Sequence, residues 1–125
     1  MKIIIFADGD NKIGLGHVVR TLNLANMLKK KHKIFFLSEK NESMKIFSEK
    51  FYTYNMKTDL ELVKKIETDL IIIDKLKIRK RDLQQLSAIT NKILAIDLIG
   101  KDYGLIKYGI PILYQKSAFK HNRIK

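Results

Sequence analysis

The feature that most constrains the fold of this chain is a set of three short apolar segments, each of which ends in an aspartate. They span residues 2–8 (KIIIFAD), 69–74 (DLIIID) and 92–97 (KILAID). Each segment lacks the polar alternation of a half-exposed strand, so each predicts a strand that is buried on both faces. Such strands are typical of parallel sheets that helices cover on both sides.

The segments between these strands predict helices and further strands. Val18, Leu22 and Ala25 recur at helical spacing and predict a helix that ends at lysines 29–31, where cations are favoured. The other expected elements are strands at 34–37, 51–54 and 110–114, a short helix at 43–50, a helix opened by a Thr58–Glu61 capping box and burying Leu60, Val63 and Ile66, and a helix over 79–90 burying Leu83, Leu86 and Ile89. This alternation predicts an α/β fold with a right-handed, Rossmann-like parallel sheet flanked by helices.

Length and composition favour one ordinary globular domain that spans residues 1–125. The chain has no cysteine, which excludes disulfides, thiolate chemistry and cysteine zinc sites, so we expect a cytoplasmic protein. The apolar run at the N-terminus stops at Asp8, too early for the core of a signal peptide, and we expect no membrane partner.

The formal charge of +12 raises the possibility of a nucleic-acid partner. Only four of the 25 basic residues are arginine, the side chain that best recognises bases and phosphates through paired hydrogen bonds. We therefore do not expect nucleic acid as a partner. A basic nucleic-acid binder stays a less favoured hypothesis for function, behind the two that are given below.

The aspartates that end the three apolar strands are Asp8, Asp74 and Asp97. Ligands of open α/β sheets bind beyond the carboxyl ends of the strands, so these carboxylates are candidates for one site near the Gly14–His17 loop. The alternative is that each carboxylate caps a following turn or helix. The residues leave both interpretations open.

Gly14, Leu15, Gly16 and His17 form a glycine loop immediately before the first expected helix. Glycines there allow a ligand to approach the backbone and the free amides of the first helical turn. A tight turn explains the same two glycines, because Val19 replaces the third glycine of the dinucleotide fingerprint.

His17 lies at the start of that helix, where the positive end of the helix dipole disfavours the imidazolium. A neutral ring can accept a proton, although a histidine at a helix start can also be structural. His32 and His121 have no ligand spacing to His17, and residues 8–13 do not match a calcium loop. We expect neither a metal site nor a cofactor.

The string Ile13-Gly14-Leu15-Gly16-His17, followed by Arg20, Leu22, Leu24 and Ala25 and preceded by Ala7-Asp8, resembles the start of the pseudaminic acid pathway hydrolases. That family removes UDP from a UDP-linked deoxy-diacetamido sugar, and spore-coat polysaccharide biosynthesis proteins are similar to it. The resemblance is dense over residues 2–28 and looser as far as Asp97. Phe6, Leu76 and Leu98 depart from the family pattern.

The resemblance implies the N-terminal domain of a two-domain, GT-B type glycosyltransferase fold. It implies that a sugar binds between the domains, that a second domain beyond Lys125 holds most of the nucleotide, and that His17 serves the attacking water. The expected substrate-binding residues are Gly14, Leu15, Gly16, Asp8, Arg20, Asp74 and Asp97. Arg20 lies three residues after His17 and can either pair with a strand-end aspartate, which we favour, or contact an anionic substrate.

Two alternatives to a hydrolase remain. One is a related sugar transferase, and the other is a non-catalytic remnant or binding domain. The sequence also leaves open whether the chain is a truncated form, one half of a split protein or a degenerate remnant.

Overall fold

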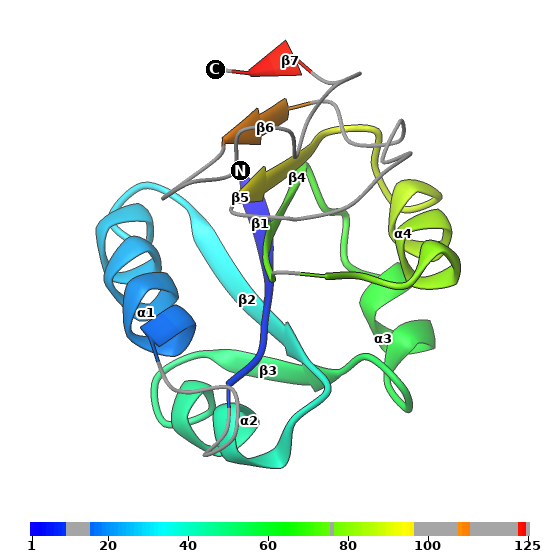
Figure 1. Ribbon diagram of the computed structural model, residues 1–125. Coiled ribbons are helices and arrows are strands. Elements are labelled where there is room, and N and C mark those ends of the chain that lie inside the picture. The colour runs from blue at the N-terminus through cyan, green and yellow to red at the C-terminus, as the bar shows by residue number, and fades with distance from the viewer. Residues whose placement is uncertain (10–15, 76, 97–107, 111–122, 125) are drawn as a thin grey trace.

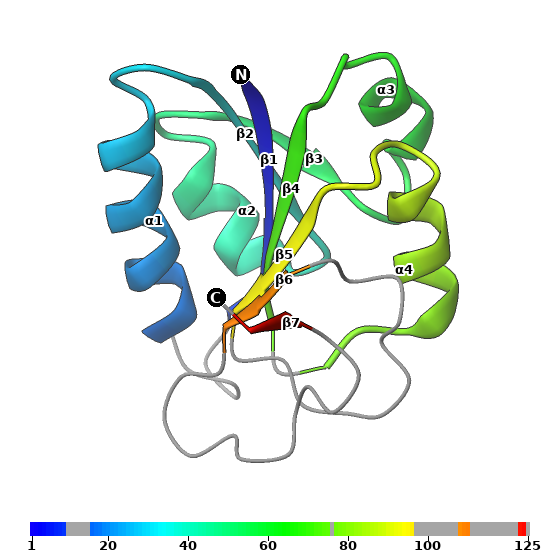
Figure 2. The same ribbon diagram turned by 90° about the horizontal axis from the view of Figure 1, so that it is seen from above.

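A parallel sheet with helices on both faces forms the fold (Figures 1 and 2). The computed structural model describes residues 1–9, 16–75, 77–96, 108–110 and 123–124, with the backbone alone at His17, 108–110 and 123–124. The strand order is β3-β2-β1-β4-β5, extended by the short strands β6 and β7, and every neighbouring pair is parallel. This order confirms the expected Rossmann-like α/β class.

The helices are α1 (Gly16–Leu28), α2 (Asn41–Phe47), α3 (Leu60–Lys64) and α4 (Lys80–Ser87). The strands are β1 (Lys2–Ala7), β2 (Lys33–Ser38), β3 (Tyr52–Asn55), β4 (Leu70–Asp74), β5 (Ile93–Ile96), β6 (Tyr108–Ile110) and β7 (Arg123–Ile124). Figure 2 shows α1 and α2 on one face of the sheet, with α3 and α4 on the other. Each expected strand before residue 97 lies within two residues of its expected position at both ends.

The central strand β1 is buried on both faces, as its sequence predicts. Ile3 and Ile5 pack into the cluster beneath α1 and α2, whereas Ile4 and Phe6 pack into the cluster beneath α3 and α4. Successive side chains of a strand point to opposite faces, so one short apolar run contributes to both hydrophobic cores.

Aromatic rings fill the core between β2 and α2. Phe36 is fully buried, and its ring stacks on that of Phe47 with 4.0 Å between centroids. Phe51 meets the ring of Phe36 edge-on at 5.2 Å. The short helix α2 is therefore held in place by tertiary packing, because a helix of this length has little stability of its own.

The expected capping box at the start of α3 is wrong. Asp59, not Thr58, is the residue before α3, and no side-chain hydrogen bond caps the helix. The Asp59 carboxylate instead accepts a hydrogen bond from the backbone N–H of Asn55, and the Asn55 side chain accepts one from the N–H of Lys57. The side chains of Asn55 and Asp59 thus stabilise a local turn before α3, and this turn forms in place of the expected Thr58–Glu61 capping box.

The last expected strand, at 110–114, overlaps the observed β6 only at Ile110, and residues 111–114 lie outside the described part of the chain. Within the described residues, no helix has the length and apolar character needed to cross a membrane.

Replacing Phe36 with Ala should lower the free energy of unfolding by about 3–5 kcal/mol, because it leaves a cavity between Phe47 and Phe51. Urea unfolding followed by circular dichroism measures the loss. Met27→Ala, at a highly exposed position, is the control and should change stability by less than about 0.5 kcal/mol. Equal effects of the two substitutions would contradict the packing described for Phe36.

Candidate functional site

The strand order reverses between β1 and β4, which lie side by side at the centre of the sheet. Ala7 at the end of β1 is in register with Asp74 at the end of β4. In open α/β sheets the ligand crevice lies beyond the carboxyl ends of the strands at such a reversal. The candidate site is therefore expected among the segments that follow β1 and β4.

The first residue of α1 is Gly16, and His17 is the second. Gly16 is exposed, and a Cβ atom added to it would meet no other atom within 4 Å. The side chain of His17 lies outside what the structure describes, as do Gly14, Leu15 and Asp97. Ile96, which precedes Asp97, is in register with Asp74, so β5 ends level with β4.

Arg20 and Asp74 form an ion pair that joins α1 to the end of β4. The Nε atom of Arg20 donates to one carboxylate oxygen of Asp74 at 3.0 Å, and a terminal guanidinium nitrogen pairs with the other oxygen. Asp74 is completely buried, and the Arg20 side chain is about one-third exposed. The two-point contact fixes the first turns of α1 against the reversal point, in agreement with the structural role that we favoured for Arg20.

Asp8 belongs to a separate group of contacts. One of its carboxylate oxygens accepts hydrogen bonds from the Ser38 hydroxyl at 2.5 Å and from the backbone N–H of Glu39 at 2.7 Å. The other oxygen pairs with Nζ of Lys75 at 2.9 Å. Asp8 therefore links the ends of β1 and β2 to the residue that follows β4.

Burial raises the pKa of Asp8, but the Lys75 charge and the hydrogen bonds from Ser38 and Glu39 outweigh that effect, and the net pKa lies below its usual value. Asp8 is therefore ionised at neutral pH and already accepts three polar contacts. A carboxylate in this state is a weak base, so its observed environment favours a structural role.

The Asp8 group continues through charged side chains toward α4. Nζ of Lys75 lies 3.5 Å from a carboxylate oxygen of Glu39 and 4.1 Å from the ring centre of Phe6. The other oxygen of Glu39 pairs with Arg79 at 3.2 Å, and Arg79 also donates to the buried Asp82 at 2.8 Å. These contacts connect the ends of β1, β2 and β4 to the start of α4.

The structure thus separates two carboxylates that the sequence grouped as one candidate site. Asp74 pairs with Arg20, whereas Asp8 pairs with Lys75. Sequence reasoning missed Ser38, Glu39, Lys75 and Arg79. A signal for Lys75 was present, since it directly follows a strand-end aspartate, but its pairing with Asp8 depends on the strand order.

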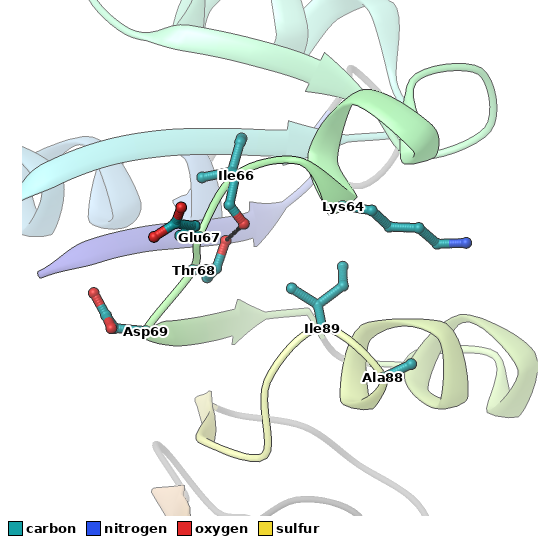
Figure 3. Close-up of a pocket in the computed structure, with 7 residues that line it drawn as sticks. All are labelled: Lys64, Ile66, Glu67, Thr68, Asp69, Ala88 and Ile89. Carbon is teal, nitrogen blue, oxygen red and sulfur yellow. Dashed lines mark hydrogen bonds between the residues drawn. The ribbon is translucent and has the colours of Figure 1, made fainter.

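A hollow among the described residues lies away from this edge. A cavity of about 450 Å³ lies between the segment joining α3 to β4 and the end of α4, at the amino end of β4 (Figure 3). Its Thr68 hydroxyl donates to the Ile66 carbonyl, its Asp69 carboxylate accepts from the Lys2 N–H, and Figure 3 shows Lys64 extending away from Asp69. Thr68 and Asp69 therefore serve local structure, and the cavity lies at the end of the sheet opposite the strand reversal.

No three histidine, aspartate or glutamate side chains within the described ranges lie close enough together to hold a metal ion. Within the same ranges, the carboxylates of Asp74, Asp8 and Glu39 are paired with the cationic side chains of Arg20, Lys75 and Arg79.

Comparison with known proteins shows similarity to an archaeal protein. The chain is 34% identical over 104 residues to an uncharacterized protein of Methanocaldococcus jannaschii, MJ1062. The match covers 78% of this chain but only 22% of the relative, so the chain spans about a fifth of that protein. No family model matches the sequence.

Replacing Asp8 with Asn should destabilise the protein by about 3 kcal/mol, because it leaves the Lys75 ammonium poorly compensated in a largely buried position. Chemical denaturation measures this loss. Adding Lys75→Met should recover part of it, and the exposed substitution Glu67→Gln is the control. If Asp8→Asn proved as mild as Glu67→Gln, the ion pair would have no structural role.

The lowered pKa of Asp8 also predicts a pH dependence of stability. Below its ordinary value of 3.8 the unfolded state binds a proton that the folded state resists, so stability falls as the pH drops from 4 toward the lower folded pKa. Denaturation of the native protein and Asp8→Asn between pH 2 and 6 should give a difference that is constant above pH 5 and shrinks below pH 4. A difference that stayed constant throughout would contradict the assigned shift.

Proposed function

We propose that this chain forms the N-terminal half of a cytoplasmic nucleotide-sugar hydrolase that releases UDP from a UDP-linked deoxy-amino sugar. The observation that carries the proposal is the position of the α1 start. The backbone of His17 lies within one helical turn of Arg20, and Arg20 is bound to Asp74 at the point where the strand order reverses. Ligands of this fold class bind at that point.

Three further observations support the proposal. The residues from Ile13 to Ala25 resemble the start of the pseudaminic acid pathway hydrolases in fixed order. The observed parallel sheet is of the kind that forms each half of a GT-B type fold. The region matched in MJ1062 is a small part of a longer protein, as expected of one domain of a larger enzyme.

The proposed chemistry needs one poised base. The neutral ring of His17 takes a proton from a water molecule while the water oxygen attacks the anomeric carbon of the sugar. The bond between that carbon and the oxygen of the diphosphate breaks, and UDP leaves with the bonding electrons. Because UDP is a good leaving group, a strong general acid is not required.

The remaining expected residues have supporting parts in this proposal. Gly14, Leu15 and Gly16 let the sugar approach the backbone, and the open space at the Cβ position of Gly16 is compatible with that part. Arg20, Asp74 and Asp8 position the edge of the sheet through their ion pairs. Asp97 is proposed to line the same crevice, and a second domain to hold the nucleotide.

A non-catalytic binding domain is the second candidate, and one observation favours it. Each carboxylate described at the carboxyl edge of the central strands is paired with a cation, namely Asp8 and Glu39 with Lys75 and Asp74 with Arg20. These paired carboxylates do not offer a catalytic base, so the catalytic hypothesis depends on His17.

The first test is release of UDP from a panel of UDP-amino sugars, with and without a candidate second domain added in trans. We expect release by the native chain in at least one combination and a loss of about 100-fold or more in His17→Ala, typical of the removal of a general base. No release from a folded protein in any combination would favour the binding domain over the enzyme.

Gly16→Ala provides a matched variant at the neighbouring position. It should fold with unchanged stability, because the added methyl group meets no neighbour within the described structure. Reduced UDP release with retained stability would place the substrate against the backbone at Gly16. Unchanged release would remove Gly16 from the proposed substrate contacts while leaving the role of His17 standing.

A further inference from the structure

A smaller hollow of about 260 Å³ lies near the carboxyl ends of the strands, between α4 and the turn that joins β3 to α3. Its apolar lining comes from Met56 and Leu60. Lys57, Arg81 and Gln85 supply polar groups. None of these residues belongs to the Gly14–His17 loop or to the Arg20–Asp74 pair, so this pocket is a different location from the proposed active site.

The pocket has an excess of positive charge that the described side chains do not compensate. Lys57 and Arg81 are exposed, and neither forms an ion pair or a side-chain hydrogen bond within the described part of the chain. The carboxylate in the lining, Asp82, is buried and bound by Arg79. Among the described residues, Lys57 and Arg81 therefore line the hollow without an acidic partner.

The Arg79 side chain also lines this pocket, and its two hydrogen bonds fix its orientation. Its guanidinium donates to Asp82 at 2.8 Å and to Glu39 at 3.2 Å. A guanidinium carries five N–H donors, so these two contacts leave donors for a third partner. The hydrogen bond to Asp82 and the nearby charge of Glu39 also raise the pKa of Arg79, as expected of a guanidinium paired with carboxylates.

We propose that this pocket binds the phosphate group of a small phosphorylated organic molecule. Lys57 and Arg81 contact the phosphate oxygens directly, a remaining N–H donor of Arg79 adds a hydrogen bond, and Met56 and Leu60 contact the organic part. Arginine favours phosphate over chloride because its planar fork donates two parallel hydrogen bonds. The Gln85 amide can donate to or accept from a hydroxyl of the ligand.

The same proposal accounts for an otherwise unfavourable sequence. Arg79, Lys80 and Arg81 are consecutive cations at the start of α4, where the helix dipole disfavours positive charge. A bound phosphate would offset that repulsion. Stability should then rise when phosphate is present, because a ligand that binds only the folded state stabilises it.

Titration of the isotopically labelled chain with inorganic phosphate, followed by amide chemical shifts, tests the proposal. We expect saturable shifts at Lys57, Arg81 and Gln85, and at least about tenfold weaker binding in the double variant Lys57→Gln/Arg81→Gln, because two charge-assisted contacts are lost. Sodium chloride at matched ionic strength should not reproduce the shifts. Shifts that chloride reproduces would overturn the proposal.

The control variant Lys30→Gln/Lys31→Gln removes the same charge from the exposed turn after α1 and should leave phosphate binding within about twofold of the native chain. Equal weakening of phosphate binding in both double variants would show that net charge explains the binding, and it would contradict the proposed phosphate site. His17→Ala should bind phosphate as the native chain does. Loss of binding in that variant would move the phosphate site to the glycine loop.

Discussion

The buried carboxylate of Asp8 is the constraint on which the carboxyl edge of this sheet depends. It lies at the end of the central strand, accepts hydrogen bonds from the end of β2, and pairs with the lysine that follows β4. A carboxylate buried to this extent would be costly without such partners. Three neighbouring strands must therefore end in register for its contacts to form.

This arrangement changes what the strand-end aspartates can do. Aspartates at the carboxyl ends of parallel strands are candidates for chemistry because they share an edge with bound ligands. Here Asp8 and Asp74 each bind a cation of the same chain and connect secondary-structure elements. Their charges set the shape and the field of the edge, and under the proposed function the base is His17 in the segment that opens α1.

The sequence predicted the sheet well because its signal is local. A buried parallel strand is a short apolar run, and each of the runs at 2–8, 69–74 and 92–97 contains the strand expected of it. The start of α3 could not be predicted in the same way. The Thr58 pattern was present, but Asp59 and Asn55 formed a competing turn whose hydrogen bonds depend on the path of the chain after β3.

The candidate site was only partly predictable, for a related reason. The Arg20–Asp74 pair follows from a helix that packs beside β4, and one of the two roles considered for Arg20 was of this kind. The partners of Asp8 required the strand order, since Ser38, Glu39 and Lys75 come from segments about 30 to 70 residues away in sequence. The spacing of these residues along the sequence does not indicate that they contact one another in the fold. Gly14, Leu15 and Asp97 lie outside the described residues, so their predicted roles stay predictions.

The central position of β1 also affects how the protein can be made. β1 is translated before both of its neighbours: one of its edges pairs with β2 from residue 33 onward, and the other pairs with β4 at residues 70–74. On the ribosome, an apolar strand with an open hydrogen-bonding edge must therefore persist until β4 has been synthesised. Chaperone binding to nascent β1 would protect the chain at the stage when this buried strand is most open to pairing with another chain, and a pause in translation before β4 would lengthen the exposure.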